Sequence, residues 1–307
     1  MTGLRAMPRL TTTVPRQYVH RASHAEVFLT GCEKLDEGRF ALTGEWPRRH
    51  AFFTHTDPAR HDALQAAETI RQAGLFLAHA EYDVPLDHQF LLSQLHLTTL
   101  PPNMVTGPGP SELSLTATCT DVVRRGKRLA QFHMNITIDR AGRPCAAGGG
   151  HFTCISQATY RRLRATTTTA TPRARTQPQH TLPPATVGKT APADVVLSST
   201  GHTSAWLLDP DPRHPILFEH AGDHYPGMVL LEAACQAATA LSHPQPFTPT
   251  AVKAHFHQYA EFTSPLSIEA TPLPAHPTHG PSTRITGTQQ NHTVFTTTVT
   301  GTRDNPT

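Results

Sequence analysis

The sequence has few charged residues, no basic block and no long apolar run. Only 16% of its 307 residues are charged, with 26 Lys and Arg against 23 Asp and Glu. This balance argues against nucleic acid as a partner. No stretch of about 18 uncharged apolar residues exists, which argues against a membrane span or a membrane partner. The N-terminal residues show no apolar core followed by a cleavage site, so we expect a cytoplasmic protein.

The cysteines follow no pairing pattern. They are odd in number, scattered, and contain no Cys-x-x-Cys pair, so neither a disulfide framework nor a zinc site is indicated. His255 and His257 would share one face of a strand and could bind a metal, but a third ligand is not evident. We therefore expect no metal and no cofactor. The five cysteines are Cys32, Cys119, Cys145, Cys154 and Cys235.

A change of composition divides the chain near its middle. Residues 165–193 read ATTTTATPRARTQPQHTLPPATVGKTAPA, which is rich in Thr and Pro and nearly free of aliphatic side chains. Such a segment buries too little apolar area to offset the entropy lost on ordering. We predict a linker over 165–193, between an N-terminal unit at 18–164 and a C-terminal unit at 194–303.

The two units share a spaced pattern of polar residues. The interval from Glu68 to Glu232 equals the interval from Gln72 to Gln236. Upstream, the string HAFFTH that begins at residue 50 corresponds to HPILFEH, which begins at residue 214, and the first histidines of the two strings keep the same interval. A match of one glutamate would mean little, but His, Glu and Gln in one order at constant spacing indicate an internal duplication.

Strand-like and helical segments recur in the same order in both units. Each contains two short strands, one long apolar helix and then four strands. A helix wrapped by a curved antiparallel sheet buries both elements, so we predict an α+β fold. The three glycines 148–150 are expected to form a turn or bulge, because no phosphate-loop context follows them. The expected strands are 27–30, 39–44, 90–97, 112–119, 129–138 and 150–155 in the first unit, and 195–198, 204–208, 252–259, 266–270, 283–287 and 293–299 in the second.

The helix positions place polar side chains together within apolar surroundings. In the first helix, expected over residues 62–82, Glu68 lies beside Arg71 and Gln72, because positions three and four apart share a face. In the second helix the same spacing brings Glu232 beside Gln236. A carboxylate rarely stays buried without a partner. Each glutamate is therefore either tied to a neighbouring donor or chemically active.

The start of the second helix suits a reaction that develops negative charge. Pro226 and Gly227 stand where this helix begins, and glycine allows a ligand to approach the backbone closely. Free N–H groups of Gly227 and Met228 at the positive end of the helix dipole would stabilise an oxyanion. Glu232, one turn further along, is predicted to act as a general base beside that oxyanion.

These residues also resemble a known group of enzymes. The pattern His220-x5-Pro-Gly-x4-Glu232-Ala-x2-Gln-Ala resembles the hotdog-fold enzymes that act on acyl thioesters, such as hydroxyacyl carrier-protein dehydratases. The longer string HPILFEHAGDHYPGMVLLEAACQAA, with its first-half partner, is more narrowly similar to the A-factor synthase family of γ-butyrolactone autoregulator synthases. This resemblance spans residues 18 to 302 apart from the expected linker.

The resemblance implies a double hotdog in which the two repeats pair within one chain. It also implies transfer of a β-ketoacyl group from acyl carrier protein to the primary hydroxyl of dihydroxyacetone phosphate, followed by closure to a butenolide. It implies catalytic roles for Glu68, Glu232 and His220. The chain departs from the family at Cys235, where the second helix of the family usually carries arginine, as Arg71 does in the first helix. The predicted substrate-binding residues are Arg71, Gln72, Gly227, Met228, Cys235 and Gln236.

Three functional classes fit these residues. The first is the acyltransferase just described. The second is a hotdog thioesterase or dehydratase, which would use water or a hydroxyacyl group and would need no phosphate site. The third is a non-catalytic acyl-binding duplicate, which is worth keeping because the arginine is missing at Cys235. The residues leave the acyl chain, the active repeat and any further oligomer undecided.

Overall fold

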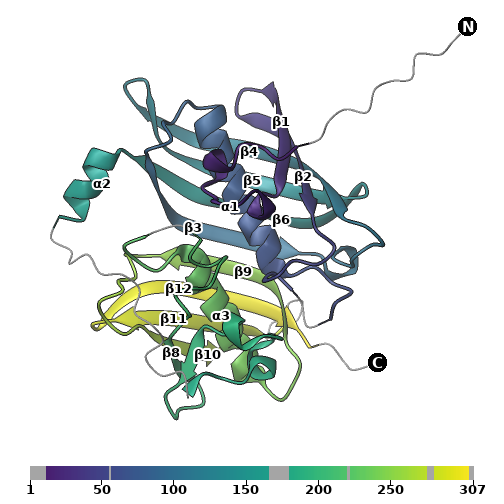
Figure 1. Cartoon of the computed structure of the whole chain (residues 1–307), viewed down its shortest axis with the longest axis vertical. Coiled ribbons are helices and arrows are strands. Elements are labelled where there is room, and N and C mark those ends of the chain that lie inside the picture. Colours follow the sequence, from purple (N-terminus) through teal and green to yellow (C-terminus); the bar gives the residue numbers. More distant parts are fainter. Residues whose placement is uncertain (1–11, 55–56, 166–179, 220–221, 275–279, 304–307) are drawn as a thin grey trace, which may run out of the picture.

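The computed structural model describes residues 12–54, 57–165, 180–219, 222–274 and 280–303 (Figure 1). The first repeat contains β1 (Leu29–Asp36), β2 (Arg39–Trp46), α1 (Ala63–Ala80), β3 (Gln89–Thr99), β4 (Ser111–Arg125), β5 (Arg128–Arg140) and β6 (Arg143–Ile155). The second contains β7 (Leu197–Ser199), β8 (Ala205–Leu208), α3 (Gly227–Ser242), β9 (Thr248–Phe256), β10 (Ser267–Pro272), β11 (Ser282–Gln289) and β12 (His292–Thr302). Between the repeats lies α2 (Gln157–Leu163).

All twelve of these strands belong to one antiparallel sheet with a symmetric order. That order is β1-β2-β4-β5-β6-β3 in the first repeat, continued by β9-β12-β11-β10-β8-β7 in the second. Read from either outer edge, the two halves follow the same sequence of elements. The central pair, β3 and β9, aligns residues 94–98 with residues 255–251. The expected pairing of two helix-and-sheet units within one chain is therefore confirmed.

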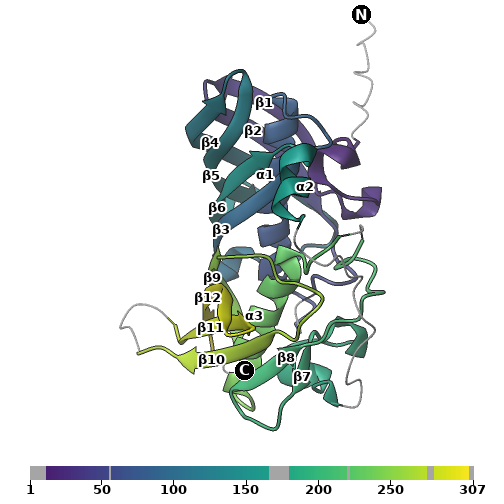
Figure 2. The ribbon, with the colours of Figure 1, turned by 90° about the vertical axis from the view of Figure 1, so that its left-hand side faces the viewer.

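Both long helices lie on the same side of this sheet, and the sheet curves around them (Figure 2). In α1 nearly every residue is buried, the exceptions being Arg71 and Ala80. Good helix formers such as Ala, Leu and Gln fill it, and the Asp62 side chain accepts a hydrogen bond from the Leu64 N–H at its start. The helix expected over 62–82 is thus present, with slightly shorter bounds.

The three glycines of β6 bring the sheet close to α1. Gly148 to Gly150 lie in the middle of a strand that pairs on both sides, so the expected turn or bulge is wrong. A Cβ at Gly148 would stand 2.3 Å from the carbonyl oxygen of His96 and 2.7 Å from Cδ1 of Ile70. The glycines allow β6 to pack closely against the neighbouring strand and α1, which their order in the sequence alone does not indicate.

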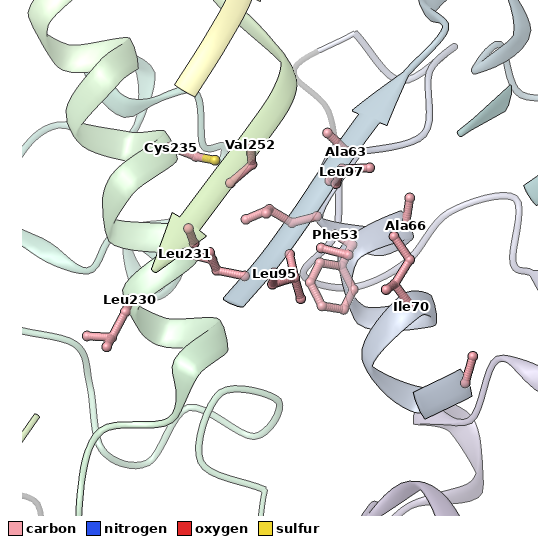
Figure 3. Packing of buried hydrophobic residues seen from close by; sticks show 14 of the residues in the cluster. Phe53, Ala63, Ala66, Ile70, Leu95, Leu97, Leu230, Leu231, Cys235 and Val252 are labelled. Atoms are coloured by element: carbon pink, nitrogen blue, oxygen red, sulfur yellow. The ribbon is translucent and has the colours of Figure 1, made fainter. Parts of the chain in front are cut away.

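The two repeats share one apolar core across the central strands. Leu95 and Leu97 of β3, Val252 of β9, Leu231 of α3 and Ile70 of α1 are all buried and belong to one cluster (Figure 3). Burial of such side chains typically contributes about 1.5–3 kcal/mol each. The repeats are therefore held together by the same packing that holds each one together.

The segment expected to be a linker is partly built into the second repeat. Residues 166–179 lie outside the described residues, but 180–193 include a 3₁₀ turn at Pro184–Val187 and the start of another at Pro192–Asp194. Val187 and Lys189 are buried. The first turn corresponds to Arg16–Val19 in the first repeat, and a residue with left-handed φ follows each turn. Amino-acid composition does not indicate this packing, because only one apolar residue and one charged residue are buried among residues 180–193.

Candidate active site

A cavity of about 490 Å³ lies between the two repeats. The β3–β9 ladder covers only residues 94–98 and 251–255. Beyond its end, residues 89–93 and 256–260 line the cavity, together with parts of α1, β6 and α3. The volume falls within the range typical of small-molecule sites. Its walls are largely apolar and include Phe90, Leu92, Phe152, Met228, Leu231 and Phe256.

Two arginines line this cavity and bind the buried carboxylate of α1. Glu68 is fully buried and accepts hydrogen bonds from Arg21 Nε at 3.0 Å and from Arg71 Nε and Nη2 at 2.8 and 2.7 Å. Burial raises the pKa of Glu68, but Arg21 and Arg71 more than offset it and hold the pKa at about 2. Glu68 therefore stays ionised and orients both guanidinium groups.

The two arginines differ in their remaining hydrogen bonds. Arg21 Nη1 also donates to the Ile216 carbonyl at 3.2 Å and to the Glu219 carboxylate at 2.8 Å, which ties the first repeat to the second. Arg71 Nη2 donates to the Val19 carbonyl, whereas Nη1 has no acceptor among the described residues. Arg71 thus keeps a donor for a ligand, while Arg21 is more fully engaged.

The N-terminus of α3 presents free backbone donors to the same cavity. Its N-cap residue, Pro226, makes no side-chain cap, and the N–H groups of Gly227 and Met228 have no acceptor in the described part of the chain. Both residues line the cavity. At the equivalent position of α1, Asp62 caps the helix instead. The open end is therefore a feature of α3, where the helix dipole favours negative charge.

A histidine at the cavity wall precedes this helix, and an aspartate lies directly before that histidine in the chain. His224 lines the cavity, and its Nδ1 lies 2.7 Å from Asp223 Oδ1. The Tyr160 hydroxyl donates to the same carboxylate at 2.5 Å, and Arg164 Nε donates to it at 3.0 Å. Burial raises the pKa of Asp223, but the donors Tyr160, His224 and Arg164 lower it to about 2. Asp223 is therefore a fixed carboxylate.

The equivalent position in the second repeat is nearly closed. A cavity of about 50 Å³ is lined by Glu232, Lys189, Cys235 and Asp62, among others. Lys189 Nζ lies 2.9 Å from Glu232 Oε1, while Oε2 is buried without a hydrogen-bond partner among the described residues. Burial raises the pKa of Glu232, and Lys189 only partly offsets this effect. Lys189 occupies the place that Arg21 has in the first repeat.

The repeated glutamines join each helix to the strands before it. Gln72 accepts a hydrogen bond from the Phe28 N–H and donates to the Glu26 carbonyl and to Glu68. Gln236 makes the same three bonds in the second repeat. Each bond lies between 2.7 and 2.9 Å. The repeated glutamines are therefore part of the buried framework.

The repeated histidines fix the turns ahead of the helices. His50 Nδ1 accepts bonds from two backbone N–H groups, and its Nε2 lies 3.2 Å from the Glu26 carboxylate. His214 repeats this arrangement with Asp194 at 3.1 Å. Both rings are buried. The duplicated pattern in the sequence thus corresponds in large part to a polar network that shapes each repeat.

The predicted site residues are divided between the two cavities. Arg71, Gly227 and Met228 meet in the large cavity. Glu232, Cys235 and Gln236 line the small one, so the structure separates Glu232 from the open helix end that was predicted to assist it. Glu68 and Gln72 lie behind Arg71 and are fully buried. His220 lies outside the described residues.

Sequence reasoning missed four charged or titratable side chains. Asp223 and His224 had one local signal, an Asp-His pair directly before the helix-opening Pro-Gly. Arg21 and Lys189 had none, because they reach Glu68 and Glu232 from loops that are distant in the chain. Within the described residues no cluster of three or more His, Cys, Asp or Glu side chains is arranged to hold a metal. No helix there is long and apolar enough to cross a bilayer.

Comparison with known sequences gives consistent matches along the chain. Residues 4–156 and 170–303 match the family model described as the A-factor biosynthesis hotdog domain. The chain is 46% identical over 286 residues to a 2-oxo-3-(phosphooxy)propyl 3-oxoalkanoate synthase of Streptomyces virginiae, covering 93% of this chain and 96% of that protein. It is 37% identical to a synthase of the same name from Streptomyces coelicolor, covering 94% and 91%.

Comparison with solved structures shows the same fold at low sequence identity. A 12:0-ACP thioesterase from Umbellularia californica superposes with a TM-score of 0.52 at 7% identity, covering 86% of this chain and 94% of that chain. A conserved hotdog-fold protein of unknown function from Alicyclobacillus acidocaldarius gives a TM-score of 0.50 at 15% identity, covering 93% and 100%. These likenesses support the hotdog fold alone.

Proposed function

Because the chain belongs to the family of A-factor biosynthesis hotdog domains, we propose that it transfers a 3-oxoacyl group from acyl carrier protein to dihydroxyacetone phosphate. The product named in its relatives, a 2-oxo-3-(phosphooxy)propyl 3-oxoalkanoate, is the ester of these two parts. The observation that carries the proposal is the large cavity, which combines apolar walls, an open helix end and an arginine with a free donor.

The open end of α3 suits the carbonyl of the acyl thioester. We place the thioester oxygen at the N–H groups of Gly227 and Met228, which line the cavity and have no acceptor among the described residues. As the acceptor hydroxyl attacks, this oxygen becomes anionic, and both the donors and the helix dipole stabilise it. The carbon–oxygen bond of the ester then forms as the carbon–sulfur bond breaks.

Arg71 suits the phosphate of the acceptor. A phosphate monoester carries close to two negative charges, which a partly buried site must balance with cations. Arg71 is held by Glu68 on one edge and keeps Nη1 for a ligand, and its side chain is 17% exposed. Arg21 is more deeply buried and is already bound to Glu68 and Glu219. We therefore assign the main phosphate contact to Arg71.

The experiment that tests this function compares thioester turnover with and without the acceptor. Purified protein is incubated with a 3-oxoacyl thioester of acyl carrier protein, and the products are weighed by mass spectrometry. We expect an ester, or the butenolide formed from it by loss of water, only when dihydroxyacetone phosphate is present. Free 3-oxo acid in both samples would instead indicate a thioesterase. An intact thioester that remains bound in both would indicate an acyl-binding protein.

A further inference from the structure

We propose that His224 is the general base that removes the proton from the attacking hydroxyl group, and that Asp223 is a positioning residue that fixes its tautomer. This inference rests on the proposed function, because it assigns a step of that reaction. It draws on His224 at the wall of the large cavity and on its contact with Asp223. Glu232, which the sequence predicted for this role, does not line that cavity, and neither does Glu68.

The hydrogen bonds of Asp223 determine which nitrogen of His224 can act. An ionised carboxylate only accepts hydrogen bonds, so the short contact between Asp223 Oδ1 and His224 Nδ1 requires the proton on Nδ1. In the neutral ring Nε2 then carries a lone pair, and no described residue bonds to it. His224 lines the cavity, and Nε2 is the nitrogen left for a ligand. An acceptor hydroxyl there would meet a base of the required form.

A dedicated set of contacts holds the pair in place. Arg164 binds Asp223 and also forms two bonds with the carboxylate of Glu261. One of them joins Arg164 Nη2 to Glu261 Oε2 at 2.8 Å. The backbone of His224 forms a bridge with Glu261, and its ring packs edge-on against Tyr259 at 4.6 Å between centroids. Tyr160 and Arg164 belong to α2 and its C-cap, so the segment between the repeats anchors the base.

The carboxylates of the two long helices do not line the large cavity. Both oxygens of Glu68 accept bonds from arginines. Glu232 faces the small cavity and is paired with Lys189. Neither carboxylate is therefore placed to take a proton from a ligand in the large cavity.

The other histidines of the large cavity are held differently from His224. His20 Nε2 lies 2.9 Å from Nε2 of His79. His151 and His257 each form a hydrogen bond with a hydroxyl group, at 2.7 and 3.1 Å. His224 thus combines access to the cavity, a fixed tautomer and proximity in sequence to the free N–H groups of α3.

The transfer begins with proton removal by His224. His224 Nε2 takes the hydroxyl proton while the hydroxyl oxygen forms a bond to the thioester carbon, which gives a tetrahedral oxyanion. The oxyanion collapses, the carbon–sulfur bond breaks, and the thiolate of the carrier takes the proton from Nε2. The products are the ester and the free thiol, and neutral His224 is restored. No oxidant, reductant or metal is required.

The test compares His224→Ala and Asp223→Asn with wild-type protein by thiol release and ester formation. We expect kcat to fall about 10²- to 10⁴-fold in His224→Ala, because a general base is lost. The KM for the thioester should stay near the wild-type value, as should the Kd for an unreactive acyl thioether. Added imidazole should restore part of the turnover in His224→Ala. Asp223→Asn should also lower kcat with little change in KM, because its amide no longer requires the proton on Nδ1.

The chain supplies a matched control in His88. Its Nδ1 lies 3.1 Å from the carboxylate of the preceding Asp87, yet it does not line the cavity. His88→Ala should keep the wild-type kcat.

Unchanged kcat in a folded His224→Ala variant would overturn the inference, as would a loss of activity that comes only from a raised KM. A wild-type protein that releases thiol but forms no ester would refute the transfer to dihydroxyacetone phosphate. In that case the rates of thioester hydrolysis by His224→Ala and by the wild type would still test the role of His224. A wild-type protein that releases neither would refute both proposals.

Discussion

The two helix glutamates occupy equivalent positions but have different neighbours. Glu68 binds two arginines, which hold its pKa at about 2. Glu232 has one lysine, and Cys235 stands where Arg71 stands in the first repeat. Burial raises the pKa of Glu232 and leaves one of its oxygens without a partner in the described chain. The first carboxylate is thus fixed as an anion, whereas the second depends on Lys189.

Arg71 is predicted to contact the phosphate of the acceptor. Arg71→Ala should remove a charged hydrogen bond of about 1.5–3 kcal/mol. This corresponds to a rise in the acceptor KM of roughly 10- to 150-fold. The KM for the acyl thioester should change little, because Arg21 still pairs with Glu68. Steady-state kinetics with each substrate varied in turn measures both values, with Cys235→Ala as the control in the small cavity. An unaltered acceptor KM would assign the phosphate to other residues.

Lys189 is predicted to be a major stabilising residue of the second repeat. Lys189→Met leaves Glu232 buried without a cation, which should cost about 3–5 kcal/mol in the free energy of unfolding. The double variant Lys189→Met/Glu232→Met should recover much of this loss. Urea denaturation measures all three proteins. A single variant as stable as the wild type would show that the pair contributes nothing.

The Lys189→Met variant should also respond to pH with a defined sign. Burial raises the folded-state pKa of Glu232 above its unfolded value, so the folded protein binds more protons in that range. Its free energy of unfolding should therefore fall as pH rises. We expect the loss of stability relative to the wild type to be smaller at about pH 5 than at about pH 8. Urea midpoints at both values test this, and a reversed trend would contradict the burial argument.

At the scale of elements, the two helices begin differently. Asp62 caps α1, while Pro226 leaves the first N–H groups of α3 free at the large cavity. The backbone at both positions is extended, with φ and ψ of −75° and 141° at Asp62 and −59° and 146° at Pro226. An aspartate would therefore fit at position 226. The difference between the ends is one of side chain and not of backbone path.

Introducing a side-chain cap at the start of α3 should damage catalysis without damaging the fold. In Pro226→Asp, the new carboxylate should accept the Met228 N–H as Asp62 accepts the Leu64 N–H. It would also place a negative charge where the oxyanion develops. Loss of one oxyanion donor typically lowers kcat about 10²- to 10³-fold. The melting temperature should hold or rise. Full turnover in a folded Pro226→Asp variant would place the thioester oxygen elsewhere.

The elements themselves were largely predictable, and the loops were not. Alternating apolar residues and the run around Glu68 predicted the strands and α1 because their burial follows a local period. The order of His50, Glu68 and Gln72, repeated at constant spacing in the second half, predicted the duplication and hence the paired fold. Lys189 was missed because its role depends on a distant partner. The segment around it has the composition of a linker but the packing of a repeat.

At the scale of the whole molecule, the two equivalent sites differ in volume by about tenfold, 490 Å³ against 50 Å³. We predict that one chain binds one acyl chain. Titration with an unreactive acyl thioether, followed by calorimetry, should give a stoichiometry of one ligand per chain. Leu92→Trp, which narrows the large cavity, should weaken this binding, whereas Thr239→Ala at the small cavity should leave it unchanged. Two equal sites per chain would contradict the prediction.

The division of residues between the cavities could not be predicted from the repeat. The sequence pattern treats Glu68 and Glu232 alike, and it places Gly227 near Glu232 because they share a helix. In the folded chain Gly227 opens onto the cavity beside α1, and Glu232 faces the cavity beside the start of that helix. Gly227 and Glu232 face different cavities because the repeats pair across β3 and β9. The spacing of residues along one helix does not indicate this pairing.

The difference between Asp62 and Pro226 also bears on how such a protein evolves. In a pair of identical subunits one codon specifies both helix starts, so any substitution alters both sites at once. Joining the two copies in one gene removes this constraint. One copy can keep an open site, while the other loses it and retains only the buried network needed for folding. Fusion thus allows the lineage to specialise one half of an ancestral symmetric pair without losing the partner that completes its structure.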